Sequence, residues 1–212
     1  MEYKETLGTT IMALKFKGGV LLAADSRTAA GSFITHRVSD KITRLYDDIY
    51  VCRSGTSADT QTLTAYASYF LDSHAQQLEK RPSVKTAAYF LRDLAYHNRE
   101  DLEASFIVAG IDKELPSIYT VTIGGTIIEQ KHFAASGSGG QFILTFLDEH
   151  FKPDMTLGQC SDLAVKACTL AMNRDNSSGG IVRLCVLRPF SAPYRVYIKG
   201  DQVIALQNPT QK

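Results

Sequence analysis

Residues 8–27, GTTIMALKFKGGVLLAADSR, contain the pattern that decides the fold. From Thr9 to Phe16 apolar residues alternate with others, a KGG segment follows, and an apolar run occupies residues 20–24. Alternation with a period of two on either side of a glycine-containing turn is typical of a β-hairpin. The sequence therefore predicts two antiparallel strands here, with Thr10 as the first strand residue behind Thr9.

A second strand pair and two helices follow this hairpin. The segment RLYDDIYVCRSG, residues 44–55, repeats the hairpin pattern with an Asp-Asp turn, so we expect four strands before the first helix. Apolar residues then recur at steps of three and four over residues 56–80, which predicts an amphipathic helix that ends before Pro82. Ser83 is typical of the N-cap of a second helix, because its side chain can accept a hydrogen bond from the first turn.

The rest of the chain repeats this order of strands and helices. Strand character is found in residues 105–112, 117–125 and 126–140, helical spacing in residues 141–151 and 156–173, and strand character again in residues 181–187 and 194–200. Strands in runs and helices in pairs favour antiparallel sheets over a doubly wound parallel sheet, in which the two would alternate singly. The predicted fold class is α+β, with two antiparallel sheets packed together and a helix pair covering each outer face.

The composition favours a single domain that binds neither nucleic acid nor a membrane. The chain has 212 residues, of which 44% are hydrophobic, which suffices for one sizeable core but is little for two. Its 23 basic and 22 acidic residues give a formal net charge of +1, with no basic tail that would favour nucleic acid. The first eight residues lack the apolar core of a secretory signal, and no stretch is apolar over the width of a bilayer, so we expect an intracellular protein.

The cysteines, histidines and glycines do not indicate a metal or a cofactor. Four cysteines lack the CxxC spacing of a zinc site and stand among apolar residues, so we expect buried, reduced thiols of a protein in the cytoplasm and nucleus. The cluster GSGGQF has Phe142 where a dinucleotide-binding motif needs its third glycine. No G-x-S-x-G nucleophile elbow is present, and the five histidines lack metal-ligand spacing. We therefore expect no metal, no cofactor and no histidine-based triad.

Thr9 is the remaining candidate nucleophile. A threonine hydroxyl is a weak nucleophile unless a base accepts its proton, and a threonine at the chain terminus can use its own α-amino group. The pKa of that amine is about 7.7–8, against about 10.4 for a lysine, so a larger fraction is unprotonated near neutral pH. Such a residue acts only once freed, and Gly8 suits the strained backbone that attack on its carbonyl requires. From these residues alone, an ordinary strand start stays open as the explanation.

Four motifs, in this order, resemble the β-type subunits of the 20S proteasome. They are GTTIMALKFKGGVLLAADSRTAAGSFITHRVSDKI (residues 8–42), CRSGTSADTQ (52–61), ASGSGGQF (135–142) and NRDNSSGGIVRL (173–184). The resemblance extends from Gly8 to about Leu187 and implies an N-terminal nucleophile hydrolase fold, a four-layer αββα sandwich. It also implies a threonine-type endopeptidase that takes part in ATP- and ubiquitin-dependent protein degradation.

The resemblance implies roles for three residues at the nucleophile. Thr9 matches the catalytic N-terminal threonine, Asp25 its acidic partner and Lys41 the active-site lysine. A charged lysine would favour the deprotonated hydroxyl and hold the terminal amine near its unprotonated state. Asp25 would keep that lysine charged and oriented, and a relay of the proton through Lys41 stays open.

Further catalytic positions follow from the same resemblance. Gly55 matches the residue whose backbone N–H donates to the oxyanion, a role that needs close backbone approach and no side chain. Ser138, Asp175 and Ser178 match the polar set that organises the terminal amine and its water. An isolated Asp, Lys or Ser is usually a capping, turn or solvated residue, so the interpretation depends on the joint match.

Within the family, the chain most resembles the beta type-1 subunit with caspase-like activity, which cleaves after acidic residues. Arg53 matches the position at the base of the specificity pocket, where a guanidinium would pair with an acidic side chain of the substrate. Thr28 would line the same pocket. A surface arginine is the ordinary alternative for Arg53, and Ser57 departs from the small apolar residue that is common at its position.

The resemblance also implies processing and assembly. Residues 1–8 would form a propeptide removed by autocatalytic cleavage between Gly8 and Thr9, which leaves residues 9–212 as one domain. The mature chain would join other alpha and beta subunits in a stacked heptameric-ring barrel, act on unfolded polypeptides and contact regulatory particles indirectly. Two alternatives stay open: a non-catalytic structural subunit of the beta ring, and an N-terminal nucleophile amidase acting on a small molecule.

Overall fold

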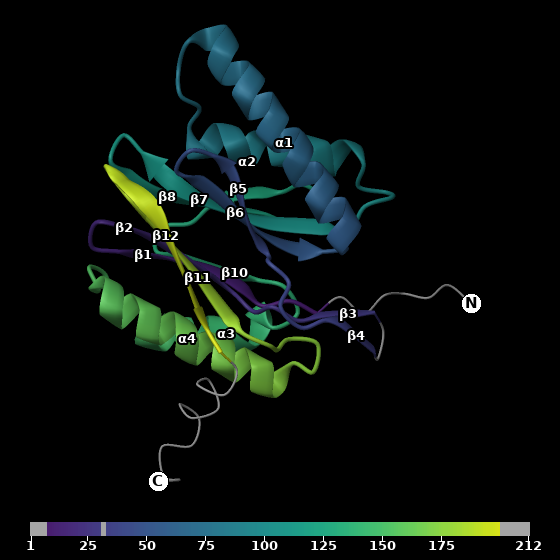
Figure 1. The fold of residues 1–212 in the computed structure, drawn as a ribbon, viewed down its shortest axis with the longest axis vertical. Helices are drawn as coiled ribbons and strands as arrows, with labels where there is room; N and C mark the ends of the chain where they lie inside the picture. The colour runs from purple at the N-terminus through teal and green to yellow at the C-terminus, as the bar shows by residue number, and fades with distance from the viewer. Residues whose placement is uncertain (1–7, 31–32, 200–212) are drawn as a thin grey trace.

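Two five-stranded antiparallel sheets pack face to face, and two helices cover the outer face of each (Figure 1). The structure, a computed structural model, describes residues 8–30 and 33–199. These four layers are the α+β sandwich that the sequence predicts, so the predicted fold class is confirmed. Apart from Gly8, the predicted propeptide lies outside the described residues, as does the predicted domain beyond residue 199.

The first sheet holds the N-terminal strand between two neighbours. Its strand order is β10-β1-β2-β11-β12, and every neighbouring pair is antiparallel. Its strands are β1 (Ile11–Phe16), β2 (Gly19–Ala24), β10 (Phe133–Ser136), β11 (Val182–Arg188) and β12 (Ser191–Ile198). β1 and β2 form the predicted hairpin, in which Ile11 lies opposite Ala24. Because β1 is paired on both sides, Thr9 and Thr10, which precede it, are held at the end of the sheet.

The second sheet contains the other predicted hairpin. Its strand order is β5-β6-β7-β8-β9, again antiparallel throughout. Its strands are β5 (Ile42–Tyr46), β6 (Ile49–Gly55), β7 (Ala104–Asp112), β8 (Leu115–Val121) and β9 (Ile127–Glu129). β5 begins directly after Lys41 and β6 ends at Gly55, so this hairpin carries two of the predicted site residues.

The four helices lie close to their predicted positions. They are α1 (Ser57–Leu78) and α2 (Val84–His97) on the second sheet, and α3 (Gly140–His150) and α4 (Leu157–Arg174) on the first. The Ser83 side chain accepts a hydrogen bond of 3.0 Å from the Thr86 N–H, so the predicted N-cap of α2 is confirmed. None of the helices within residues 8–30 and 33–199 is both long and apolar enough to cross a membrane.

Three apolar layers hold the sandwich together. Successive side chains of β1 point to opposite faces, so Met12 and Leu14 pack against α3 and α4 whereas Ile11 and Ala13 pack between the sheets. The third layer lies between the second sheet and α1 and α2, with Phe106 fully buried in it. The N-terminal strand therefore contributes to two of the three layers.

A short hairpin, β3 (Thr28–Ala30) and β4 (Phe33–His36), corrects the prediction of four strands before the first helix. In the part of the chain that the structure describes, six strands precede α1. All four residues of β4 are exposed, and Phe33 keeps 75% of its surface accessible. Alternation reveals a strand when one face is buried, so a hairpin that projects from the sheets, as in Figure 1, leaves no such pattern.

A substitution in the layer between the sheets tests this packing. Leu22→Ala removes a fully buried side chain and leaves a cavity, so it should lower the free energy of unfolding by about 2–5 kcal/mol. Leu115→Ala is the matched control, because Leu115 is 69% exposed and should change that free energy by at most about 0.5 kcal/mol. Urea unfolding of the full chain followed by circular dichroism measures both. Equal losses would contradict the assignment of Leu22 to the core.

Candidate active site

A cavity of about 380 Å³ lies beside Thr9 at one end of the two sheets. Its wall comes from the segment before β1, the β3–β4 hairpin, the loop before β5, the end of β6 and the start of α1. Its lining residues are Gly8, Thr9, Thr28, Ala29, His36, Ser39, Asp40, Lys41, Arg53, Gly55, Ser57, Thr60 and Gln61. The predicted residues Thr9, Thr28, Lys41, Arg53 and Gly55 all line this one cavity.

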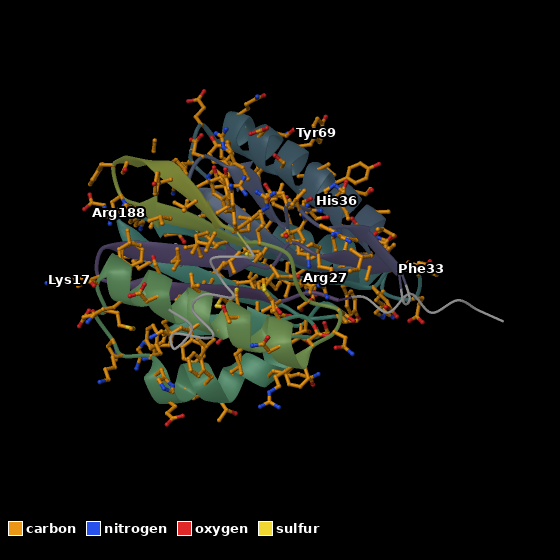
Figure 2. All side chains as sticks on the ribbon, turned by 60° about the horizontal axis from the view of Figure 1, so that its bottom comes forward. Lys17, Arg27, Phe33, His36, Tyr69 and Arg188 are labelled. Atoms are coloured by element: carbon orange, nitrogen blue, oxygen red, sulfur yellow. The ribbon has the colours of Figure 1, made fainter. Side chains whose placement is uncertain are left out.

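The cavity lies at the end of the molecule that carries the β3–β4 hairpin. Figure 2 shows Phe33 and His36 of β4 toward this end, with Arg27 just before the hairpin. Lys17, in the turn between β1 and β2, and Arg188, at the end of β11, lie at the opposite end. The segments that leave the sheets toward the hairpin therefore converge on the cavity.

Thr9 is buried and its hydroxyl faces the peptide bond that precedes it. Thr9 Oγ1 donates a hydrogen bond of 2.6 Å to the carbonyl oxygen of Gly8. Its backbone N–H donates to Ser138 Oγ at 3.0 Å, and its carbonyl oxygen accepts from the Gly139 N–H at 3.1 Å. Only 5% of the Thr9 surface is accessible, so the hydroxyl, the amide nitrogen and the carbonyl group are all fixed in direction.

An ion pair between Lys41 and Asp25 lies directly behind the start of β1. Lys41 Nζ is 2.6 Å from Asp25 Oδ1 and donates a second hydrogen bond, of 3.1 Å, to the Gly8 carbonyl oxygen. The fully buried Asp25 also accepts from the backbone N–H groups of Thr10, at 2.9 Å, and Gly179, at 3.0 Å. Burial of a charge is tolerated when the charge is paired and hydrogen-bonded. This pair connects the start of β1, the loop before β5 and the loop after α4.

Burial lowers the pKa of Lys41, and the charge of Asp25 together with its hydrogen bond opposes that shift. The net direction is downward, because desolvation disfavours the charged ammonium more than the nearby carboxylate favours it. The expectation that Asp25 keeps Lys41 charged thus describes one of two opposing effects. A lysine with a lowered pKa exchanges its proton more readily near neutral pH than an exposed lysine does.

A chain of hydroxyl groups surrounds the Asp175 carboxylate. Ser138 Oγ donates to Asp175 Oδ2 at 2.7 Å, and Ser178 Oγ donates to the same oxygen at 2.6 Å. Because an ionised carboxylate only accepts, both hydroxyl protons point toward Asp175. The lone pair of Ser138 is then free to accept the Thr9 N–H, and Ser178 accepts from Thr10 Oγ1 at 2.7 Å. The structure therefore brings the predicted polar set together next to the Thr9 nitrogen.

Thr10 belongs to this network, which the sequence interpretation missed. The prediction made Thr10 the first strand residue, but β1 begins at Ile11, and Thr10 is fully buried with a bonded hydroxyl. Its N–H and its hydroxyl bind Asp25 and Ser178, which are distant in sequence. The presence of a second threonine after Thr9 was the only signal, and it is equally typical of a strand.

Two positions at the site leave no space for a Cβ atom and therefore require glycine. A Cβ atom on Gly8 would overlap the side chain of Ser177, so no larger residue fits before Thr9 without a shift. Gly55 has φ +118°, a conformation that favours glycine, and a Cβ there would overlap the carbonyl oxygen of Glu103. The close backbone approach expected at Gly55 is present, whereas its role as an oxyanion donor stays a prediction.

Arg53 lines the cavity and carries a positive charge. Its Nη2 donates a hydrogen bond of 2.6 Å to the backbone carbonyl of Asp40, and among residues 8–30 and 33–199 it forms no ion pair. Burial lowers the pKa of its guanidinium, with the charge of Asp40 opposing. Its Nε is buried and has no hydrogen-bond partner in the described part of the chain. Thr28 and Ser57 line the same cavity.

The cysteines and the acidic residues form no metal site in the part of the chain that the structure describes. All four cysteines are free and buried, which confirms the prediction of buried thiols. Burial raises the pKa of Cys160 to about 12 and that of Cys185 to about 11. These thiols therefore stay protonated at neutral pH and contribute to packing.

The architecture and the position of Thr9 just before the first strand define the class of N-terminal nucleophile hydrolase folds. A comparison with protein-family models matches residues 5–187 to the family described as proteasome subunit. The chain belongs to this proteasome subunit family, and its similar relatives are subunits of beta type.

Three relatives show the extent of the similarity. Proteasome subunit beta type-6 of Dictyostelium discoideum is 46% identical over 182 residues, 85% of each chain. Proteasome subunit beta type-9 of Rattus norvegicus is 42% identical over 92% of this chain and 89% of its own length. Proteasome subunit beta type-1 of Saccharomyces cerevisiae is 42% identical over 86% of this chain and 84% of its own length. Such similar values for three types do not single out the caspase-like type-1 subunit.

A stability measurement tests the buried ion pair. Lys41→Ala leaves Asp25 buried without its cation and should lower the free energy of unfolding by about 3–5 kcal/mol. Arg44→Ala is the matched control, because its pair with Asp47 is exposed and should contribute at most about 1 kcal/mol. Urea unfolding of the full-length chain measures both variants. A loss no larger in Lys41→Ala than in Arg44→Ala would show that the pair does not hold the fold.

Proposed function

We propose that this beta-type proteasome subunit is catalytic: a threonine-type endopeptidase of the 20S core, with Thr9 as its nucleophile after autocatalytic cleavage between Gly8 and Thr9. The observation that carries the proposal is the position of the Thr9 hydroxyl, 2.6 Å from the Gly8 carbonyl oxygen that Lys41 also contacts. The Thr9 hydroxyl, which is the nucleophile, and the Lys41 ammonium, which donates a hydrogen bond to the carbonyl oxygen, thus meet at the bond to be cleaved. A structural subunit has no need of this arrangement.

Maturation proceeds by an acyl shift within the chain. Thr9 Oγ1 attacks the carbonyl carbon of Gly8, the C–N bond breaks, and the hydroxyl proton ends on the Thr9 nitrogen, which leaves an ester and a free amine. The Lys41 ammonium donates to the Gly8 oxygen as negative charge develops there. Water then hydrolyses the ester, which releases residues 1–8 with a carboxylate on Gly8 and restores the Thr9 hydroxyl.

The freed amine then serves as the general base of peptide hydrolysis. It accepts the Thr9 hydroxyl proton as the oxygen attacks a substrate carbonyl, and it returns a proton to the leaving amine. Ser138 holds an N–H of this amine through a lone pair that Asp175 leaves free. The backbone N–H of Gly55 donates to the oxyanion, and water resolves the acyl-enzyme on Thr9.

The pocket prefers an acidic residue before the scissile bond. Arg53 offers a partly desolvated guanidinium that forms no ion pair among the described residues, and Thr28 adds a hydroxyl on the same wall. A substrate carboxylate in this cavity would give the Arg53 guanidinium the ion pair that it lacks among the described residues. The substrates are unfolded polypeptides that reach the subunit within a barrel of stacked heptameric rings, in the ATP- and ubiquitin-dependent degradation of proteins in the cytoplasm and nucleus.

Intact-mass analysis of the assembled particle tests maturation. The wild-type subunit should lack residues 1–8, and Thr9→Ala should retain them, because alanine has no hydroxyl to attack Gly8. Thr9→Ser should be processed, and Thr126→Ala, an exposed threonine far from the cavity in sequence, should behave as wild type. A wild-type subunit that keeps residues 1–8 in mature particles would instead support the non-catalytic structural alternative.

Peptide hydrolysis tests the acidic preference. Arg53→Leu should lower kcat/KM for a peptide with Glu before the scissile bond by about tenfold or more, because a charge-assisted hydrogen bond is lost. The same peptide with Leu in that place should lose less. Arg44→Leu is the control, since Arg44 is an exposed arginine paired with Asp47. If the ratio of Glu to Leu cleavage is the same in Arg53→Leu and wild type, Arg53 does not set the preference.

A further inference from the structure

The tripeptide Ser39-Asp40-Lys41 forms one wall of the cavity, and each residue is held by a different contact. The Ser39 hydroxyl lies 2.6 Å from Thr28 Oγ1. The carbonyl of Asp40 accepts from Arg53 Nη2 at 2.6 Å, and the carbonyl of Lys41 accepts from the Arg53 backbone N–H at 2.9 Å. The position of this tripeptide therefore determines where the Lys41 side chain starts and in which direction the Arg53 guanidinium points.

Arg195 holds the same tripeptide from outside the cavity. It lies on β12, opposite Cys185 of β11, and is not among the lining residues. Its Nη2 is 2.8 Å from each carboxylate oxygen of Asp40 and 3.2 Å from the Ile42 carbonyl oxygen. The Ile42 N–H donates to Asp40 Oδ1 at 3.0 Å. The one cation that pairs with the Asp40 carboxylate within the described residues thus comes from the edge strand of the first sheet.

The Asp40 carboxylate places a negative charge beside a pocket for negative side chains. Asp40 and Arg53 line the same cavity, and the charge of Asp40 reaches the guanidinium, because it opposes the effect of burial on the pKa of Arg53. Without a partner, this carboxylate would attract Arg53 and repel an acidic substrate. A cation bound to Asp40 reduces both effects.

Arg183 provides an internal comparison. It lies on β11, and its Nε and Nη2 donate to the carbonyl oxygens of Ser39, at 3.1 Å, and Val38, at 2.6 Å. Arg183 therefore supports the same loop through backbone contacts and touches no carboxylate among the described residues. Of Arg183 and Arg195, only Arg195 both contacts the loop and pairs with the Asp40 carboxylate.

We propose that Arg195 determines the specificity of this site by neutralising Asp40, which leaves the charge of Arg53 available to an acidic side chain before the scissile bond. This inference rests on the proposed acidic preference and adds a residue to it. Arg195 acts through Asp40 and is a positioning residue that does not touch the substrate. Its removal should raise KM for acidic peptides more than it lowers kcat.

Matched peptides with Glu or Gln before the scissile bond test the proposal in assembled particles. The activity of a Thr9→Ala particle is subtracted, so that only hydrolysis at this subunit is compared. Arg195→Met should lower the Glu/Gln ratio of kcat/KM by about threefold to tenfold, mainly through KM for the Glu peptide. Adding Asp40→Asn should restore the ratio, because the uncompensated charge is gone. Arg195→Lys should keep most of the preference.

The outcomes separate this inference from the proposed function. If wild type prefers Glu and Arg195→Met keeps that ratio, the role of Arg195 is overturned while the acidic preference stands. If the Glu/Gln ratio falls in Arg195→Met and does not recover in Arg195→Met/Asp40→Asn, Arg195 only supports the loop, and its proposed role is overturned. Arg183→Met, which removes loop contacts alone, then shows the same fall in the ratio. If wild type has no Glu preference, the acidic preference and the inference fail together. Recovery in the double variant is the result that supports the proposal.

Discussion

A lysine charge that is withdrawn from water needs a partner, and the pair of Lys41 with Asp25 meets this need at the centre of the site. Asp25 also accepts backbone hydrogen bonds from Thr10 and Gly179, so three segments distant in sequence are fixed around one carboxylate. Asp25 directly follows Ala24, the last residue of β2, so the β1–β2 hairpin fixes its position. The geometry at Thr9 is therefore a consequence of where two sheets place one ion pair.

Local patterns suffice for most of the fold. The alternation in residues 11–24 determines which β1 and β2 side chains face the helices and which face the other sheet, and burial follows it. Ser83 signals a helix start through its own side chain, and that signal is short-range as well. The order of strands and helices favours antiparallel sheets over a doubly wound parallel sheet, and the observed pairs are antiparallel. The residues of the candidate site were predicted from the resemblance of their motifs to a family. The spacing of these residues in the sequence does not show that they meet beside Thr9.

What the sequence does not disclose depends on contacts between distant segments. All four residues of β4 are exposed, so Phe33 gives no periodic signal. Thr10 resembles any strand residue until its hydroxyl meets Ser178, and Asp40 meets Arg195 across 155 positions of sequence. Such pairs depend on the register of strands within a sheet and on the packing of the layers. No window of neighbouring residues contains that information.

The tight contact between Gly8 and Ser177 also sets a rule for modifying the chain. Lys41 and Thr9 reach the carbonyl oxygen of Gly8, which every residue type carries, so these contacts place no demand on the sequence further upstream. At Gly8, the one described residue before Thr9, the missing Cβ is the side-chain requirement. An affinity tag or a fluorescent protein fused in place of residues 1–7 should therefore keep glycine as the last residue before Thr9.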